Sequence, residues 1–408
     1  MKTEKLVSET SNRSLNISAN EVTSLRINES RENTVRVYKD GFIGVEGRLG
    51  NADFADMEKA ATQKLSQGIA YPETHDEVLQ LDIDVEKEII SEKEFVAKIK
   101  RLVARLSQEN PEFLFSNKIK LCKSALSYEN SDGTLLHYKG NEFVCSLVIK
   151  HKSSANIMDE SYYATSTYYN EEQICHDVKL ICDAFLQKLP QLDADEITVI
   201  GDIDPIGYAV NQMIADLYFN HASLLEGKLG QKIFNDKLTV MVDRRPENKF
   251  NTAFFDAEGV VNQNFHKALV QNGTFQRLLT CKKSAQKYGV ENSGSAYAEY
   301  TDVPDIGGGL TVESTAKDLA NLVEGDAVYI SETSGGDMTA SGDISLPVMV
   351  GYLYRGGKLV GRLPEFAVSV NMFDLLGANF VGVTEKGLFE FGKQKHLVYK
   401  VKMVNKSN

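Results

Sequence analysis

The sequence lacks the features that would place the protein at a membrane or on a nucleic acid. No apolar run approaches the roughly 18 residues needed to cross a bilayer, and residues 1–20 contain no apolar segment typical of a signal peptide. The 45 Lys and Arg residues are outnumbered by 57 Asp and Glu residues, and the net charge of −12 repels phosphate backbones. We therefore expect a cytoplasmic protein that binds neither a membrane nor nucleic acid.

Several common catalytic motifs are also missing. The five cysteines form no C-x-x-C pair, so the sequence predicts neither a zinc ribbon nor a thioredoxin-type redox site. Gly307–Gly309 and Gly335–Gly336 are followed by no Lys-Ser or Lys-Thr and lack the G-x-G-x-x-G spacing, which favours turns over a nucleotide site. There is no G-x-S-x-G elbow of a serine hydrolase, and no two histidines lie within five residues of each other.

What is present predicts an α+β protein with a sizeable core, since 42% of the residues are hydrophobic and 25% are charged. Strand and helix signals do not alternate regularly, which favours mainly antiparallel sheet over a doubly wound fold. We divide the chain into residues 1–85, an N-terminal strand–strand–helix region with a linker, residues 86–195, a middle region of helices and strands, and residues 196–408, a β-rich domain.

Local signals predict the individual elements. Short apolar stretches predict strands at Glu21–Ile27 and Thr34–Tyr38, and the acid-rich stretch 69–86, which contains a proline, is typical of a linker. Asp204 followed by Pro205 predicts the start of a helix that runs to about Leu225.

The last two hundred residues resemble the TldD/PmbA family, also called modulators of DNA gyrase. The stretch Leu224–Phe234 is similar to the segment that follows this family's metal-binding helix, and several further motifs follow in the family's order. These are Asp256–Val260 (D-x-E-G-V), Leu269–Gly273, Lys283–Gly289, Glu291–Ser295 and Gly335–Gly336 with Ser341–Asp343. Glu21–Gly68 also resembles the family's N-terminal unit, so the resemblance covers most of the chain.

The resemblance implies a lost metal site. TldD-type members carry H-E-x-x-x-H just before the L-E-G triplet, and a cysteine near the C-terminus completes their zinc site. Alignment on Leu225–Gly227 places Tyr218 and Ser223 at the histidine positions and Phe219 at the glutamate position, and no cysteine follows Cys281. Tyrosine and serine are poor zinc ligands beside imidazole, and phenylalanine accepts no proton, so the chain resembles the PmbA (TldE) branch without a metal.

Three functions stay open from the sequence. The first is a non-catalytic subunit paired with a TldD-like zinc peptidase that processes unfolded peptides, with the zinc on the partner and none on this chain. The second is a hydrolase with an unconventional site, for which His221, Glu226 and Asp256 are candidates; the same three are candidates for a substrate or partner groove. The third is a stand-alone interaction protein, such as a modulator of gyrase or of a toxin–antitoxin system, which could form a homodimer.

Overall fold

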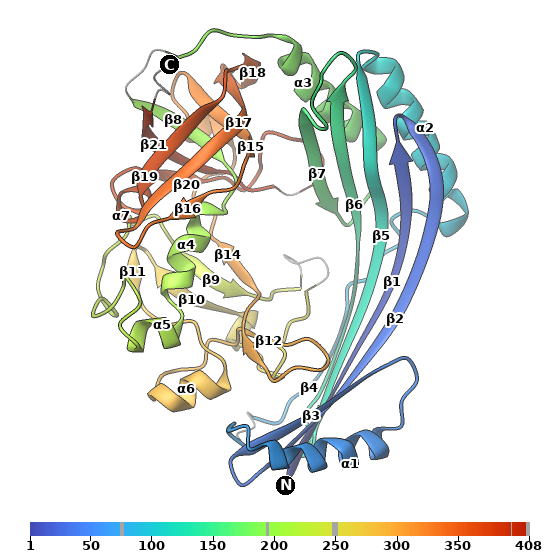
Figure 1. Cartoon of the computed structure of the whole chain (residues 1–408), viewed down its shortest axis with the longest axis vertical. Coiled ribbons are helices and arrows are strands. Elements are labelled where there is room, and N and C mark those ends of the chain that lie inside the picture. The colour runs from blue at the N-terminus through green and yellow to red at the C-terminus, as the bar shows by residue number, and fades with distance from the viewer. Residues whose placement is uncertain (74–76, 193–195, 247–251, 393, 405–408) are drawn as a thin grey trace.

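The structure is a computed structural model that describes residues 1–73, 77–192, 196–246, 252–392 and 394–404. One long, curved sheet makes up the N-terminal half, and its concave side faces a C-terminal half built of smaller sheets and short helices (Figure 1). The predicted α+β class with mainly antiparallel sheet is confirmed. No helix within the described ranges is long and apolar enough to cross a membrane.

Seven strands form the N-terminal sheet in the order β3-β2-β1-β5-β6, and β6 then pairs with β4 over its first residues and with β7 over its last. Only the β4–β6 pair is parallel. The elements are β1 (Lys2–Ser18), β2 (Glu21–Lys39), β3 (Phe42–Leu49), α1 (Phe54–Lys64), β4 (Gln80–Asp84), α2 (Glu92–Glu109), β5 (Phe113–Asn130), β6 (Leu135–His151), β7 (Glu160–Ser166) and α3 (Glu171–Leu186).

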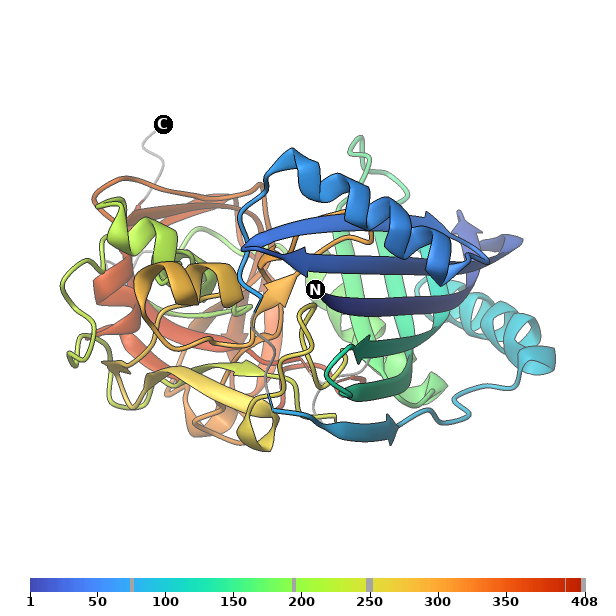
Figure 2. The same ribbon diagram turned by 90° about the horizontal axis from the view of Figure 1, so that it is seen from below.

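Helices cover the sheet only at its two ends. At one end α2 and α3 enclose a core that contains Phe95, Ile99 and Ile174, and α1 lies at the other end (Figure 1). Seen from below, α1 (blue) lies along part of the strands (Figure 2). Between these ends, residues 5–14 of β1 and 120–127 of β5 are half-buried or exposed on both faces. A long polar stretch of sheet therefore remains accessible on both of its faces.

Two predictions for this half are wrong in detail. The strands expected at Glu21–Ile27 and Thr34–Tyr38 are parts of the single strand β2. The stretch 69–86, predicted to be a linker, carries β4, although its residues 74–76 lie outside the described residues. β1 carries no strand signal in the sequence, because its middle is polar and accessible on both faces.

The C-terminal half contains sheets of four, two and eight strands. Its elements are β8 (Glu196–Gly201), α4 (Pro205–Gln212), α5 (Ala215–Phe219), β9 (Val240–Asp243), β10 (His266–Gln271), β11 (Thr274–Phe275), α6 (Lys282–Tyr288), β12 (Ala296–Tyr297), β13 (Asp305–Ile306), β14 (Leu310–Val312), β15 (Ala327–Thr333), β16 (Asp337–Met338), β17 (Asp343–Arg355), β18 (Lys358–Arg362), β19 (Phe366–Asn371), α7 (Met372–Leu376), β20 (Phe380–Val383) and β21 (Leu397–Val404).

The prediction of one helix from Asp204 to about Leu225 is wrong, because the helix breaks between α4 and α5. Ile214 has an extended backbone and forms a parallel bridge with Leu279. The N–H of Leu279 donates to the carbonyl of Met213 at 2.8 Å, and the N–H of Ala215 donates to the carbonyl of Leu279 at 3.1 Å. These bonds to a neighbouring segment take the place of helical bonds at the break.

The two halves share hydrophobic core as well as contacting each other. One cluster of buried side chains joins Phe95 of α2 and Ile174 of α3 to Tyr352 of β17 and Val398 of β21. A continuous core of this kind fixes the position of the concave sheet relative to the C-terminal half.

Candidate functional site

Tyr218 and Phe219, which the resemblance aligns with a histidine ligand and with the glutamate base, lie in the last turn of α5. The hydroxyl of Tyr218 accepts a hydrogen bond from the N–H of Gly227 at 3.1 Å. The ring of Phe219 stacks on Tyr288 of α6, with centroids 4.4 Å apart and an angle of 15° between the rings. Both side chains thus hold α5 against neighbouring segments.

The third position, Ser223, lies in the turn after α5, and its side chain also makes structural hydrogen bonds. Its hydroxyl donates to the carbonyl of Gln212 at 2.5 Å and accepts from the N–H of Leu225 at 3.0 Å. Ser223 therefore ties the turn back to the end of α4. A hydroxyl engaged in this way completes a turn, and its chemistry differs from that of an imidazole ligand.

His221 and Glu226 form a surface pair in the same turn. Nδ1 of His221 lies 2.5 Å from Oε1 of Glu226, and His221 has a positive φ of 59°. Both side chains are exposed to solvent, where an ion pair contributes little to stability. The structure thus brings together two of the three candidate residues of an unconventional site.

Asp256, the third candidate, lies in a different environment. It is buried, and Oδ1 accepts from the N–H groups of Glu258 and Val260, each at 2.9 Å, while Oδ2 accepts from the N–H of Ala296 at 2.9 Å. Burial raises the pKa of Asp256, and the nearby charge of Arg244 acts in the opposite direction. The carboxylate closes the D-x-E-G-V turn and attaches it to β12.

Glu258, at the second acidic position of this turn, joins the turn to both halves of the molecule. Its carboxylate accepts a hydrogen bond from the hydroxyl of Tyr71, which precedes β4, and one from the N–H of Lys282 in α6 at 2.9 Å. Burial and the neighbouring charge of Asp256 raise the pKa of Glu258. The D-x-E-G-V motif marks this residue in the sequence, but the motif does not indicate which residues bind its carboxylate.

A buried arginine of the N-terminal sheet reaches the same turn. Nη1 of Arg36 in β2 donates to the carbonyl of Ala257 and lies 3.4 Å from Oε2 of Glu4 in β1. The hydroxyl of Tyr38 donates to the same carboxylate oxygen at 2.7 Å. We call Arg36, Glu4, Tyr38, Glu258 and Tyr71 the lower joint, since they connect the lower end of the sheet to the C-terminal half. Nothing in the sequence singles out Arg36 or Glu4.

A second buried carboxylate lies where β7 meets the C-terminal sheet. Glu160 is completely buried and accepts hydrogen bonds from the hydroxyls of Tyr352 at 2.6 Å and Ser331 at 2.8 Å and from the N–H of Ser161 at 2.9 Å. Burial raises the pKa of Glu160 to about 7, although these bonds oppose the shift. No sequence motif marks Glu160.

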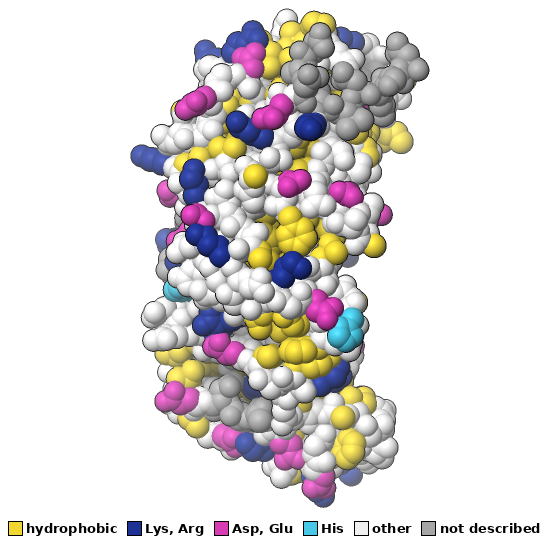
Figure 3. Space-filling view, turned by 90° about the vertical axis from the view of Figure 1, so that its left-hand side faces the viewer, with side chains coloured by type: hydrophobic (Ala, Val, Ile, Leu, Met, Phe, Trp, Pro, Cys, Tyr) yellow, Lys and Arg dark blue, Asp and Glu magenta, His cyan; other side chains and the backbone are white. Residues whose placement is uncertain are grey.

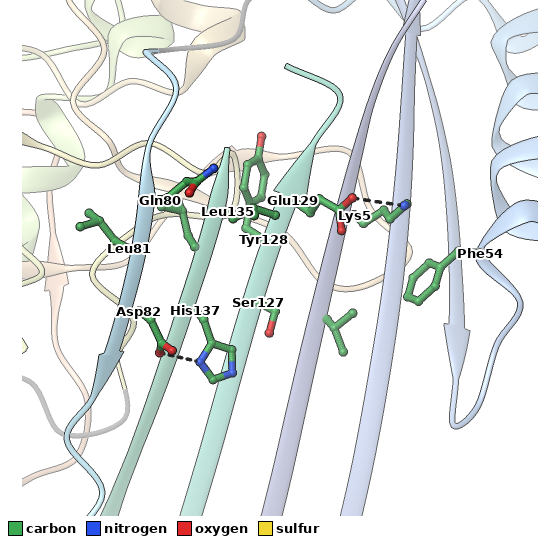
Figure 4. Close-up of a pocket in the computed structure, with 12 residues that line it drawn as sticks. Lys5, Phe54, Gln80, Leu81, Asp82, Ser127, Tyr128, Glu129, Leu135 and His137 are labelled. Atoms are coloured by element: carbon green, nitrogen blue, oxygen red, sulfur yellow. Dashed lines mark hydrogen bonds and ion pairs between the residues drawn. The ribbon is translucent and has the colours of Figure 1, made fainter. Parts of the chain in front are cut away.

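A pocket of about 510 Å³ opens on the face of the N-terminal sheet that carries α1 (Figure 4). Its charged side chains are paired within it, because Lys5 lies 3.5 Å from Glu129 and Asp82 lies 3.0 Å from His137. The pocket shares no lining residue with the turn after α5 or with the lower joint, but Tyr128, which lines it, lies beside Gly259. Within the described ranges, no three His, Cys, Asp or Glu side chains converge as a metal site requires.

The outer side of the C-terminal half, turned away from the long sheet, has scattered hydrophobic patches between charged side chains (Figure 3). Phe219 and Leu229 are among the exposed hydrophobic residues of this half. Single exposed hydrophobic residues are common on protein surfaces and define no site by themselves.

Residues 206–397 match the model of the PmbA/TldA metallopeptidase C-terminal domain. The family resemblance predicted from the L-E-G and D-x-E-G-V motifs is thereby confirmed.

Similar proteins agree with this assignment. A metalloprotease of Archaeoglobus fulgidus is 24% identical over 86% of this chain and 84% of its own length. A metalloprotease of Methanothermobacter thermautotrophicus is 28% identical over 44% of this chain, but that match spans only 39% of the relative. Among solved structures, TldE from Thermococcus kodakarensis shares the fold with a TM-score of 0.78 at 15% identity, covering 98% of this chain and 96% of that chain. A Thermotoga maritima protein assigned as a modulator of a DNA gyrase has a TM-score of 0.79 at 19% identity, over 99% and 96%.

The glycine of the D-x-E-G-V turn gives a direct test of how tightly this turn is packed. Gly259 has a φ of +72°, and an added Cβ would lie 2.4 Å from the ring of Tyr128. We expect Gly259→Ala to lower the free energy of unfolding by roughly 2–5 kcal/mol, the sum of a left-handed backbone and a steric clash. Gly227→Ala is the control, because φ is +70° but no atom lies within 4 Å of its Cβ, and it should cost about 1–2 kcal/mol. Equal losses in urea titrations of the two variants would show that the turn is not tightly packed.

Proposed function

We propose that this chain is the non-catalytic subunit of a TldD/TldE-type peptidase complex that cleaves unfolded peptides in the cytoplasm. The observation that carries the proposal is that Tyr218, Phe219 and Ser223 all make structural contacts with neighbouring segments. All three occupy positions of a zinc site in catalytic relatives, and here they hold α5 and its turn in place.

The chemistry of zinc supports the same proposal. A catalytic zinc in a peptidase needs protein ligands such as imidazole, thiolate or carboxylate, and a nearby base that takes the proton of the bound water. The phenyl ring of Phe219 cannot act as that base, and the helix ends at Phe219, before Ser223. The zinc and the base would therefore come from a TldD-like partner subunit.

The long sheet supports a role in handling the substrate. The middle of β1 and β5 offers an accessible, mainly polar surface on the concave side that faces the C-terminal half. Such a surface can form one wall of a chamber, and strand edges can hold an extended peptide through backbone hydrogen bonds that depend little on sequence. The name of the similar TldE structure and the names of the archaeal metalloproteases are consistent with this role.

The test is to produce this chain with a TldD-like subunit encoded in the same genome, purify each alone and together, and measure zinc and the hydrolysis of an unstructured peptide. We expect equimolar co-purification, zinc on the partner only, and hydrolysis by the mixture. A Glu→Gln change at the base of the partner's H-E-x-x-x-H motif should reduce the rate by roughly 10²–10⁴-fold.

Variants of this chain separate its role from catalysis. Tyr218→Phe and Ser223→Ala, made together in this chain, should leave kcat of the mixture within about twofold of the unmodified value, because neither side chain contacts the reacting atoms. Stoichiometric zinc and hydrolysis by this chain alone would refute the proposal and favour the hydrolase hypothesis. Stable protein without any affinity for a TldD-like subunit would favour the interaction-protein hypothesis.

A further inference from the structure

Three cationic side chains lie together on one face of the long sheet: Arg26 of β2 and Lys118 and Lys120 of β5. Arg26 pairs with Ser14 of β1, which pairs in turn with Lys120, and Lys118 comes two residues before Lys120 in the same strand. Neighbouring strands lie about 4.8 Å apart and same-face residues of one strand about 6.7 Å apart, so the three Cα atoms lie within roughly 7–12 Å of one another. We call these three residues the cationic patch.

The cationic patch lies on the concave side of the sheet, which faces the C-terminal half (Figure 1). Arg26 and Arg36 are an even number of residues apart in β2, and no register shift lies between them, so their side chains point to the same face. Arg36 donates to the carbonyl of Ala257 in the C-terminal half. Lys120 shares this face, because it lies in one row with Arg26 across the strands.

The cationic patch is not neutralised by the protein itself. Arg26 and Lys118 are exposed and Lys120 is half-buried, and within the described ranges none of the three has an acidic partner within 4.0 Å. Cations of the same strands on the opposite face are neutralised: Lys5 by Glu129, Arg13 by Glu92, Arg31 by Glu9 and Lys123 by Glu86. In a chain with a net charge of −12, a group of cations without partners on one face indicates an anionic ligand.

Short amide and hydroxyl side chains surround the cationic patch. They are half-buried or exposed and lie in the adjacent rows of the same face, Ser24 and Asn16 beside Lys118, and Asn28 and Asn12 beyond Lys120. Amide side chains and hydroxyls both donate and accept hydrogen bonds. They can therefore bind the backbone amides of an extended chain that lies across the sheet, whose own backbone groups are already paired between strands.

We propose that the cationic patch binds acidic side chains of an extended peptide, so that this subunit selects substrates rich in Asp and Glu. The inference rests on the proposed function and adds the substrate class to it. Side chains on one side of an extended peptide recur about every 6.7 Å, which matches the spacing of Lys118 and Lys120. Glutamates at alternate positions of a peptide can therefore contact both lysines, and Arg26 lies within reach of a third carboxylate.

An acidic peptide fits this surface better than a nucleic acid does. Single-stranded nucleic acids are bound by cations combined with several aromatic side chains on which the bases stack. The rows that contain the cationic patch carry one exposed aromatic residue, Tyr163, which pairs with Ser146 beside Lys118. The net charge of −12 also repels a long phosphate backbone.

Fluorescence anisotropy of the purified full-length chain tests the proposal without a partner subunit. The probes are an unstructured peptide with glutamate at alternate positions and the same peptide with glutamine in place of each glutamate. At low ionic strength we expect the glutamate peptide to bind about tenfold more tightly, because each exposed ion pair contributes about twofold to threefold. The combined variant Arg26→Gln, Lys118→Gln and Lys120→Gln should bind both peptides equally.

The matched control removes three lysines from the helices on the opposite face. Lys59→Gln, Lys93→Gln and Lys100→Gln together change the net charge by the same amount at exposed positions of α1 and α2, and should preserve the tenfold difference. Equal binding of the two peptides by the unmodified chain, or a difference that survives the loss of the cationic patch, overturns the proposal. Tighter binding of a single-stranded oligonucleotide of the same charge overturns the assignment to a peptide.

Hydrolysis by the mixture with a TldD-like subunit distinguishes failure of this inference from failure of the proposed function. Loss of the cationic patch should raise KM for the glutamate peptide about tenfold and leave kcat within about twofold, since the patch contacts only side chains away from the cleaved bond. Cleavage of both peptides with equal kcat/KM by the unmodified mixture would support the proposed function and overturn the acidic preference. Selective binding of the glutamate peptide without any hydrolysis by the mixture would support the patch and refute the proposed function.

Discussion

Replacing Arg36 by methionine is expected to lower the free energy of unfolding by about 3–5 kcal/mol. Arg36 and Glu4 are both buried and form an ion pair between β2 and β1. Removal of the guanidinium takes away the cation that lies 3.4 Å from the buried Glu4 carboxylate. Methionine has a similar length, so the loss reports mainly on charge and hydrogen bonding and less on a cavity.

The effect should extend beyond the sheet, because Arg36 also donates to the carbonyl of Ala257 in the D-x-E-G-V turn. That carbonyl belongs to the segment that Asp256 and Glu258 hold against β12 and α6. Hydrogen exchange should therefore accelerate at the N–H groups of Glu258 and Ala296 in Arg36→Met, in addition to those of β1 and β2.

A double variant and a surface control make the interpretation specific. Glu4→Gln combined with Arg36→Met removes both members of the ion pair and should be more stable than Arg36→Met alone, because the carboxylate is no longer buried without the Arg36 guanidinium. Arg355→Met removes an exposed arginine that pairs with Asp326, and it should change the free energy of unfolding by no more than about 1 kcal/mol. If Arg36→Met costs no more than Arg355→Met in urea titrations, the lower joint does not stabilise the fold.

The sequence predicts elements well where one side of an element is buried, and poorly where neither side is. The strand predicted at Thr34–Tyr38 lies in the buried part of β2. β1 gives no such pattern, because residues 5–14 are accessible on both faces. The break at Ile214 depends on Leu279, a residue 65 positions away that local patterns cannot contain.

The candidate site shows the same limit. The family resemblance identifies Tyr218, Phe219 and Ser223 as the positions to inspect, and the structure adds what each of them contacts. The partnership of Arg36 with Glu4, and of Glu160 with Tyr352, joins residues 32 and 192 positions apart. A buried polar network of this kind leaves no periodic signal, since each member is a single polar residue in an otherwise ordinary strand.

Glu160 is expected to make the stability of the protein fall as the pH rises from about 4 to 7. Burial raises the pKa of the folded-state carboxyl to about 7, whereas an unfolded glutamate has a pKa of about 4.3. Between these values the folded protein holds a proton that the unfolded chain has released. Stability therefore decreases by about 1.4 kcal/mol per pH unit, to a total loss of roughly 3–4 kcal/mol, and this contribution is constant above pH 7.

The groups that surround Glu160 explain why its pKa is raised. The hydroxyls of Tyr352 and Ser331 and the N–H of Ser161 all donate to the carboxyl group, but no cation compensates its charge in the contacts of the described residues. The charge of Glu332 on β15 raises the pKa of Glu160 further. Deprotonation therefore places a negative charge in the contact between β7 and the C-terminal sheet, and the hydrogen bonds offset only part of its desolvation.

Glu160→Gln tests this directly, because the amide resembles the protonated acid in shape and never ionises. At about pH 5 the variant should be within roughly 1 kcal/mol of the unmodified protein, and at about pH 8 it should be more stable by about 3 kcal/mol. Glu94→Gln is the control. Glu94 is exposed, and hydrogen bonds from Ser91 and Lys98 lower its pKa. This variant should therefore leave the change of unfolding free energy with pH unchanged between these pH values. Urea titrations across this range measure the slope, and parallel curves for Glu160→Gln and the unmodified protein would mean that Glu160 is already ionised in the folded state at pH 5.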